Sequence, residues 1–141
     1  MDHLGATGTS VVLDVAAGTG EPGLTVARRA PDASVVLTDL SPEMLAVATR
    51  RAEGMGVTNV ETRVCSADDL PFDDASFDTV SVRFGLMFFP DLDRATAELG
   101  RVLAPGGRLC SSVWIEPEQN PWTAIALQAI ATEVELPAPD P

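Results

Sequence analysis

Residues 18–23 contain three glycines, Gly18, Gly20 and Gly23, in the spacing Gly-x-Gly-x-x-Gly directly after an apolar segment. Gly18 and Gly20 allow positive φ angles and the close approach of another molecule. Pro22 suits the first turn of a helix, because its missing amide hydrogen costs nothing there. Backbone amides at the start of a helix and the carboxyl end of a strand bind polar or anionic groups. The segment therefore predicts a nucleotide-type binding site.

The acidic residues around this loop bear on which nucleotide it binds. With Asp39 at the end of the next predicted strand, the glycine spacing matches a dinucleotide fingerprint, so a nicotinamide-dependent dehydrogenase is one interpretation and an ordinary tight turn is another. Asp14 precedes the loop, Glu21 lies in it, and residues 67–70 read Ala-Asp-Asp-Leu. We expect the Asp14 carboxylate to reach the pocket, where such charges repel a pyrophosphate and attract a sulfonium. S-adenosylmethionine, a cationic nucleotide without phosphates, fits better.

Alternating strand and helix patterns position these residues. Short apolar or alternating segments predict five strands, at residues 11–15, 34–40, 60–65, 77–84 and 108–114. Helical spacing predicts helices at residues 22–30, 42–54 or 42–56, 91–103 and 121–136, the third ended by the Pro-Gly-Gly sequence at 105–107. We therefore predict an α/β fold with a doubly wound, mostly parallel sheet. One domain covers residues 1–141, with residues 1–9 as a loose leader and an amphipathic tail helix at 121–136.

The composition limits the classes of function. The chain has 21 Asp and Glu against 9 Lys and Arg, a formal net charge of -12, which disfavours nonspecific binding to nucleic acid or an anionic membrane. It has no apolar segment of roughly 20 residues and no signal sequence, so we expect no membrane span and a cytoplasmic protein. His3 is the single histidine, and Cys65 and Cys110 show no metal-ligand spacing. We expect no metal site and no disulfide.

Five motifs, within residues 11–114, occur in the order found in a known family. They are residues 13–20 (LDVAAGTG), 38–45 (TDLSPEML), 67–72 (ADDLPF), 76–80 (SFDTV) and 102–107 (VLAPGG). Together they resemble class I S-adenosylmethionine-dependent methyltransferases, with the greatest likeness to the group that contains the ubiquinone and menaquinone biosynthesis C-methyltransferases. The resemblance implies a Rossmann-like methyltransferase core, S-adenosylmethionine as cofactor, S-adenosylhomocysteine as product, no metal and a small-molecule acceptor.

The resemblance also implies which residues hold the cofactor. They are Asp14, Ala16, Gly18, Thr19, Gly20, Asp39, Leu40, Met44, Ser66, Ala67, Asp68, Arg83 and Phe84. The loop from Asp14 to Gly20 would hold the methionine end. Asp39 would accept hydrogen bonds from both ribose hydroxyls, as one ionised carboxylate can. Leu40 and Met44 would pack on the adenine, although Met44 also suits a helix core.

The adenine contact departs from the family pattern. Relatives usually read Gly-Asp-Ala after the third strand, whereas residues 65–67 read Cys-Ser-Ala. Ser66 would accept the hydrogen bond of the adenine amino group, or Asp68 would do so instead. Arg83 and Phe84 correspond to residues that line the sulfonium side, although Arg83 also suits a plain surface position. No catalytic residue is assigned, because methyl transfer to an acceptor that is already nucleophilic depends mainly on in-line positioning.

Family members have helices before the first strand and two further strands after the fifth, and neither is found in this sequence. The resemblance therefore implies a core truncated after the fifth strand, whose exposed edge invites pairing. We expect a fragment of a longer protein or a homo-oligomer joined through that edge and the tail helix. Packing of the tail helix within the chain is the alternative. The expected interface residues are Trp114, Trp122, Ile125, Leu127 and Ile130.

Two classes of function follow. The first is a small-molecule methyltransferase or the cofactor-binding core of one. The second is a binding module that retains S-adenosylmethionine or S-adenosylhomocysteine without catalysis, and a nicotinamide-dependent dehydrogenase is a distant third. Acceptor pockets in this family are built largely from segments outside the predicted core. We therefore expect the chain to bind the cofactor, while its own turnover stays an open question.

Overall fold

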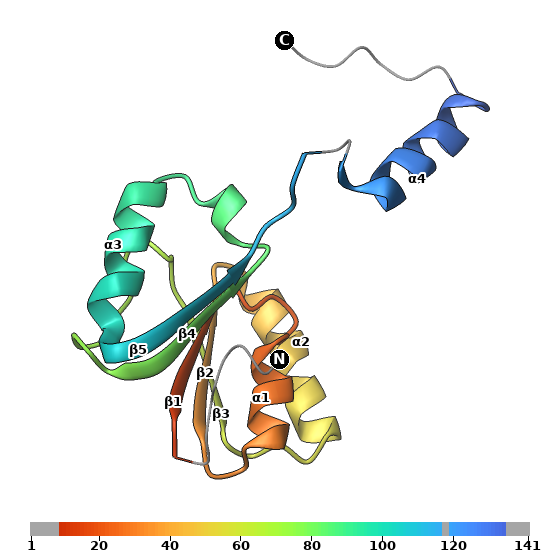
Figure 1. The fold of residues 1–141 in the computed structure, drawn as a ribbon. Helices are drawn as coiled ribbons and strands as arrows, with labels where there is room; N and C mark the ends of the chain where they lie inside the picture. Colours follow the sequence, from red (N-terminus) through yellow and green to blue (C-terminus); the bar gives the residue numbers. More distant parts are fainter. Residues whose placement is uncertain (1–8, 117–118, 135–141) are drawn as a thin grey trace.

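Five parallel strands form one sheet in the order β3-β2-β1-β4-β5 (Figure 1). The computed structural model describes residues 9–116 and 119–134. The strands are β1 (Val11–Val15), β2 (Ser34–Asp39), β3 (Val60–Val64), β4 (Phe77–Arg83) and β5 (Leu103–Ser112). The helices are α1 (Gly23–Arg29), α2 (Pro42–Gly54), α3 (Leu92–Val102), α4 (Pro121–Ala131) and the short 3-10 helix η1 (Leu86–Phe88). The predicted α/β fold with a doubly wound parallel sheet is confirmed.

Two hydrophobic clusters cover the two faces of the sheet. Alternate residues of a strand point to opposite faces, so Val12 packs with α1 and α2 on one face while Leu13 packs with α3 on the other (Figure 1). β1 lies at the centre, and its residues from Val12 to Val15 are all buried. This two-sided burial explains why the strand is apolar at every position except Asp14.

The helices that follow β2 and β4 begin where local sequence signals place them. The Ser41 hydroxyl accepts a hydrogen bond from the Met44 amide at 3.2 Å, and Pro42 occupies the first helical position of α2. Asp91 caps α3 in the same way, with its Oδ1 atom 2.9 Å from the Arg94 amide. Both caps lie at the carboxyl edge of the sheet, so they fix where each chain segment turns beside the pocket described below.

The boundary between α3 and β5 differs from the prediction. The helix ends at Val102 and the strand begins at the next residue, so the Pro-Gly-Gly sequence at 105–107 lies within the strand and does not end the helix. Phe77 pairs with Leu103 while Thr79 pairs with Arg108, which leaves residues 104–107 as a bulge. Gly106 has a φ of 80°, a conformation that favours glycine. The sequence at 105–107 therefore shapes an irregular strand.

The carboxyl-terminal end of the described chain contributes little to the core. α4 stands away from the sheet (Figure 1), with Ile125 65% and Ile130 48% exposed, so the packing of the tail helix within the chain is not found for these residues. The side chains of Trp122 and Leu127 lie outside the described residues, as do the predicted leader up to residue 8, with His3, and residues 135–136 of the predicted tail helix. In the described parts of the chain, no helix is long and apolar enough to cross a membrane.

Candidate functional site

A pocket of about 280 Å³ opens at the carboxyl edge of the sheet, where ligands of open α/β sheets bind. Segments that follow four different strands line it, because the carboxyl ends of parallel strands meet at one edge. The lining residues are Val15, Ala16, Asp39, Leu40, Cys65, Ser66, Ala67, Asp68, Phe84, Gly85, Phe88, Phe89, Pro90 and Asp91. A mostly apolar wall with a few acidic and hydroxyl groups suits a ligand with a flat apolar part and hydrogen-bond donors.

Asp39 joins the glycine loop to the start of α2. Its Oδ2 atom accepts a hydrogen bond from the Gly18 amide at 2.8 Å, and its Oδ1 atom accepts one from the Ser41 amide at 2.9 Å. An ionised carboxylate offers about four acceptor positions, so further donors from a ligand can still bind it. Asp39 therefore lines the pocket and also holds the glycine loop in place through the Gly18 amide.

Asp14 lies beneath the loop, and its carboxylate does not line the pocket that it was expected to reach. The residue is fully buried, with Oδ2 2.8 Å from the Gly23 amide and Oδ1 2.6 Å from the Ser81 hydroxyl. Burial raises the pKa of Asp14 from 3.8 to about 6, although both hydrogen bonds act to lower it. The side chain points to the α1 face of the sheet, because its neighbours along β1 take the other face.

Gly23, the third glycine of the loop, makes room for this carboxylate. A Cβ atom at Gly23 would lie 3.0 Å from Asp14 Oδ2 and 2.2 Å from Leu37 Cδ2. The glycine therefore allows α1 to approach the sheet closely, while its amide satisfies the buried acid. Its presence in the glycine spacing is explained by packing within the protein.

Glu21, the acid within the loop, is neutralised by Arg51 of α2. Its Oε1 atom lies 3.0 Å from Arg51 Nη2, and its Oε2 atom accepts a hydrogen bond from the Thr25 hydroxyl at 2.7 Å. Arg51 also donates to the Thr19 carbonyl oxygen at 2.6 Å. The electrostatic argument for a sulfonium ligand thus fails for Glu21 as well as for Asp14, since neither charge faces the pocket.

Arg83 is the last residue of β4 and Phe84 follows it, and only Phe84 lines the pocket. Arg83 donates from Nε to the Glu21 carbonyl oxygen at 3.2 Å, and its guanidinium lies 5.3 Å from the centre of the Phe84 ring, outside the pocket. Phe84 does line the pocket, with a positive φ of 59°. Its ring stacks on Trp114 at 4.4 Å between centres and 9° between planes. The aromatic stack therefore connects the pocket wall to the residues just after β5.

The segment after β3 forms another wall. Cys65, Ser66, Ala67 and Asp68 all line the pocket, so the structure brings both predicted acceptors for an adenine amino group to it. The Ser66 carbonyl oxygen accepts a hydrogen bond from the Asp69 amide at 3.3 Å. Partial burial raises the pKa of the Cys65 thiol, which is therefore neutral near pH 7. This wall presents oxygen acceptors and a small neutral sulfur group.

The structure divides the predicted cofactor-binding residues into two sets. Those that line the pocket are Ala16, Asp39, Leu40, Ser66, Ala67, Asp68 and Phe84. Those that do not are Asp14, Gly18, Thr19, Gly20, Met44 and Arg83. Gly18 donates to Asp39, Thr19 accepts from Arg51, and the Gly20 amide donates to the Ala17 carbonyl oxygen, while Met44 is a 46% exposed residue on α2.

The prediction missed the wall that follows β4. Phe88 and Phe89 line the pocket together with residues 90–91, and Phe88 is 76% exposed. The sequence does indicate this wall, because three of the five phenylalanines of the chain fall within residues 84–89, directly after a strand. An aromatic cluster at a carboxyl strand end indicates a binding surface when its side chains stay exposed. Among the described residues, no group of three histidine, cysteine or acidic side chains could hold a metal ion.

The sequence comparisons match this region to known methyltransferases. The chain is 50% identical over 100 residues to the demethylmenaquinone methyltransferase of Thermus thermophilus, covering 70% of this chain and 44% of that protein. It is 48% identical over 99 residues to the ubiquinone/menaquinone biosynthesis C-methyltransferase UbiE of Bordetella parapertussis, covering 70% of this chain and 38% of that protein. The chain thus spans about two fifths of the length of these curated relatives.

Structural comparison finds a solved protein of the same fold. The crystal structure of the YcgJ protein from Bacillus subtilis superposes with a TM-score of 0.76 at 30% identity, covering 92% of this chain and 54% of that one. A family model described as a methyltransferase domain matches residues 12–107, which contain β1 from its second residue, β2 to β4 and every residue of the pocket. The chain therefore belongs to the methyltransferase domain family, as its resemblance to S-adenosylmethionine-dependent methyltransferases predicted.

Proposed function

We propose that this chain is the cofactor-binding core of an S-adenosylmethionine-dependent enzyme that methylates a small, apolar acceptor. The observation that carries the proposal is the pocket beside Asp39, whose carboxylate stands between the glycine loop and the wall at residues 65–68. Family membership supports the cofactor class. The chemistry of the pocket supports the fit, because a carboxylate, a hydroxyl and apolar surfaces match the ribose, the amino group and the faces of adenosine.

Each part of the cofactor has a proposed partner. Asp39 accepts hydrogen bonds from the ribose hydroxyls, alongside or in place of the Gly18 amide that it now holds. Leu40 and Ala67 flank the adenine, and Ser66 or Asp68 accepts from its amino group. Ala16, Gly18, Thr19 and Gly20 contribute backbone groups to the methionine end, with Met44 and Arg83 at the periphery. Asp14 acts through the loop, whose Gly23 amide it holds.

The acceptor lies against the aromatic wall after β4. Phe88 is largely exposed beside the pocket, and Phe84 and Phe89 continue the wall. Such a surface suits a planar apolar ring, in agreement with the quinone-pathway names of the relatives. When bound, S-adenosylmethionine supplies an electrophilic methyl group. The protein contributes by aligning the acceptor carbon or heteroatom with that methyl group and by excluding water.

The sheet edge supports a proposal about assembly. Within the described residues β5 pairs only with β4, and Leu109, Val113 and Ile115 are each about half exposed. We propose that a second copy of this chain, or further residues of a longer protein, cover this edge. The predicted absence of nucleic-acid partners and the predicted cytoplasmic location stay predictions.

Calorimetry with S-adenosylhomocysteine and with NAD tests the cofactor. We expect the chain to bind S-adenosylhomocysteine at one site and to give no heat with NAD. Asp39→Asn should weaken this binding by about 100-fold or more, because hydrogen bonds to a charged acceptor contribute roughly 1.5–3 kcal/mol each. Asp69→Asn, an exposed neighbour of the pocket wall, is the charge-matched control. Equal affinity in wild type and Asp39→Asn would contradict the ribose assignment, and binding of NAD would contradict the cofactor class.

Turnover separates an enzyme from a binding module. A chain that binds S-adenosylhomocysteine and transfers a labelled methyl group from S-adenosylmethionine to a reduced quinone or a phenol is a methyltransferase. A chain that binds the product tightly and methylates none of these acceptors supports the binding module.

A further inference from the structure

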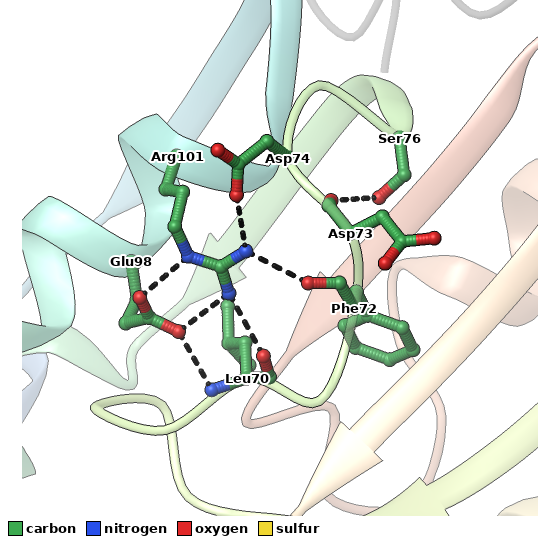
Figure 2. A network of polar contacts seen from close by, with 7 residues as sticks. All are labelled: Leu70, Phe72, Asp73, Asp74, Ser76, Glu98 and Arg101. Carbon is green, nitrogen blue, oxygen red and sulfur yellow. Dashed lines mark hydrogen bonds and ion pairs between the residues drawn. The ribbon is translucent and has the colours of Figure 1, made fainter.

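The segment that connects β3 to β4 begins as a pocket wall and has no helix or strand of its own at residues 66–76. Its backbone groups must nevertheless find hydrogen-bond partners where they are shielded from water. At Leu70, which is 3% exposed, the side chains of α3 provide them. Glu98 Oε2 accepts from the Leu70 amide at 2.9 Å, and Arg101 Nη2 donates to the Leu70 carbonyl oxygen at 2.9 Å (Figure 2).

Arg101 uses all three guanidinium nitrogens in this network. Nε and Nη2 form a fork on the two carboxylate oxygens of Glu98, each at 2.7 Å. Nη1 donates to the Phe72 carbonyl oxygen at 2.7 Å and to Asp74 Oδ1 at 2.8 Å (Figure 2). We call Glu98 and Arg101 together the α3 clamp. Because only a planar guanidinium presents this set of donors, lysine cannot replace arginine in it.

The clamp differs from an ordinary surface ion pair. The side chains of Glu98 and Arg101 are only 20% and 30% exposed, and their contacts are bidentate and charge-assisted. The hydrogen bonds from Arg101 lower the pKa of Glu98 from 4.5 to about 2, so the acid is ionised throughout the range in which the protein would work. The clamp therefore keeps its charges and its geometry at neutral pH.

Short connections transmit this geometry to the pocket. Leu70 lies two residues after Asp68 in the chain, directly after a turn at residues 66–69 that is closed by the hydrogen bond from the Asp69 amide to the Ser66 carbonyl oxygen. Ala67 is buried in the same hydrophobic cluster as Leu70. At its other end, α3 is capped by Asp91, which also lines the pocket. The cap of this helix thus contributes to the pocket directly, and the last turn of the helix holds a second wall.

We propose that Glu98 and Arg101 are positioning residues for the cofactor, because they hold the wall at residues 66–68 in the shape that receives the adenine. The proposal rests on the proposed function of the pocket. Without the clamp, the Leu70 amide loses its partner and the Leu70 carbonyl oxygen keeps only the Phe72 amide, so the segment samples conformations in which the wall is displaced. The apparent affinity for the cofactor then falls in proportion to the fraction of molecules in which the wall keeps the shape that binds the cofactor.

Arg101→Lys and Glu98→Gln test the clamp, with Arg94→Lys, at an exposed site on the same helix, as the matched control. We expect each clamp variant to raise the dissociation constant of S-adenosylhomocysteine about tenfold at a temperature well below unfolding. The KM for S-adenosylmethionine should rise similarly while kcat changes little. A clamp variant that stays folded and keeps wild-type affinity would overturn the proposal, however much its thermal stability drops, because the clamp would then serve stability alone.

Amide hydrogen exchange without ligand gives a second test of the clamp, and this test does not depend on the identity of the cofactor. We expect faster exchange at residues 66–70 in both clamp variants and unchanged exchange in β1 and β2. Unchanged exchange at residues 66–70 would overturn the proposal. If the wild-type chain binds no S-adenosylhomocysteine, the proposed function fails, and the exchange rates alone then decide whether the clamp positions the wall.

Discussion

Replacing Asp14 by asparagine tests the buried carboxylate under the glycine loop. Burial raises the pKa of Asp14 to about 6 in the folded protein, whereas the ordinary value of 3.8 applies to the unfolded chain. Between these two values the folded state binds a proton more tightly than the unfolded state. The contribution of Asp14 to the free energy of unfolding is therefore highest below pH 3.8 and is lost as the pH rises through about 6.

The two pKa values set the size of this loss. A difference of about two pKa units corresponds to a total of about 3 kcal/mol, of which about 2 kcal/mol develops between about pH 4 and about pH 7. Asparagine has nearly the same shape as aspartate and does not titrate. Its carbonyl oxygen can accept from the Gly23 amide, and its amide can donate to the Ser81 hydroxyl oxygen. The variant should therefore keep the packing of the loop and lose the pH dependence.

Urea unfolding followed by circular dichroism at several pH values measures the effect. We expect the difference in unfolding free energy between Asp14→Asn and wild type to move by about 2 kcal/mol in favour of the variant as the pH rises from about 4 to about 7. Asp32→Asn, in the exposed turn before β2, is the control for loss of one acidic group. Parallel pH profiles of Asp14→Asn and wild type would refute the reasoning, since Asp14 would then titrate alike in both states.

Three further substitutions probe the loop and the aromatic wall. Gly23→Ala should lower the free energy of unfolding by about 1–3 kcal/mol, because the new Cβ atom would lie 2.2 Å from Leu37 Cδ2. Thermal denaturation measures this loss, and the control is Gly100→Ala, whose Cβ atom would meet nothing within 4 Å. Phe88→Ala should change stability by less than about 0.5 kcal/mol but raise the KM for a phenolic or quinol acceptor, and an unchanged KM would exclude it from the acceptor wall. Trp114→Phe should abolish a fluorescence change caused by S-adenosylhomocysteine, and a signal that persists would assign the change to another site.

Local signals in the sequence were sufficient to predict most of the helices and strands. Ser41 and Pro42 specify the start of α2 through a cap and a preset φ angle, which depend only on neighbouring residues. Runs of apolar residues at helix and strand spacing predicted the order of elements in the same way. The end of α3 was predicted to within one residue, but the start of β5 was predicted at 108 and lies at Leu103, because the Pro-Gly-Gly sequence that resembles a helix stop forms a bulge opposite β4.

Part of the site was predictable for a topological reason. The carboxyl ends of parallel strands meet at one edge, so Asp39 and the residues after β3 reach the same pocket even though they are far apart in the sequence. The exposed aromatic side chains after β4 were missed. Their apolar sequence alone does not show whether they are buried in the core or left open to a ligand.

What the sequence by itself determined was the family, the order of the elements and the strand ends to within two residues, because these depend on short motifs and local periodicity. The tertiary structure decided the role of each charge. Asp14 finds Ser81 at a separation of 67 residues, and Glu21 finds Arg51 at 30, so charges assigned to the ligand belong to the scaffold. Arg101 likewise finds Leu70 across 31 residues. Such partners come into contact only when packing brings distant segments together, so a pattern of neighbouring residues cannot predict them.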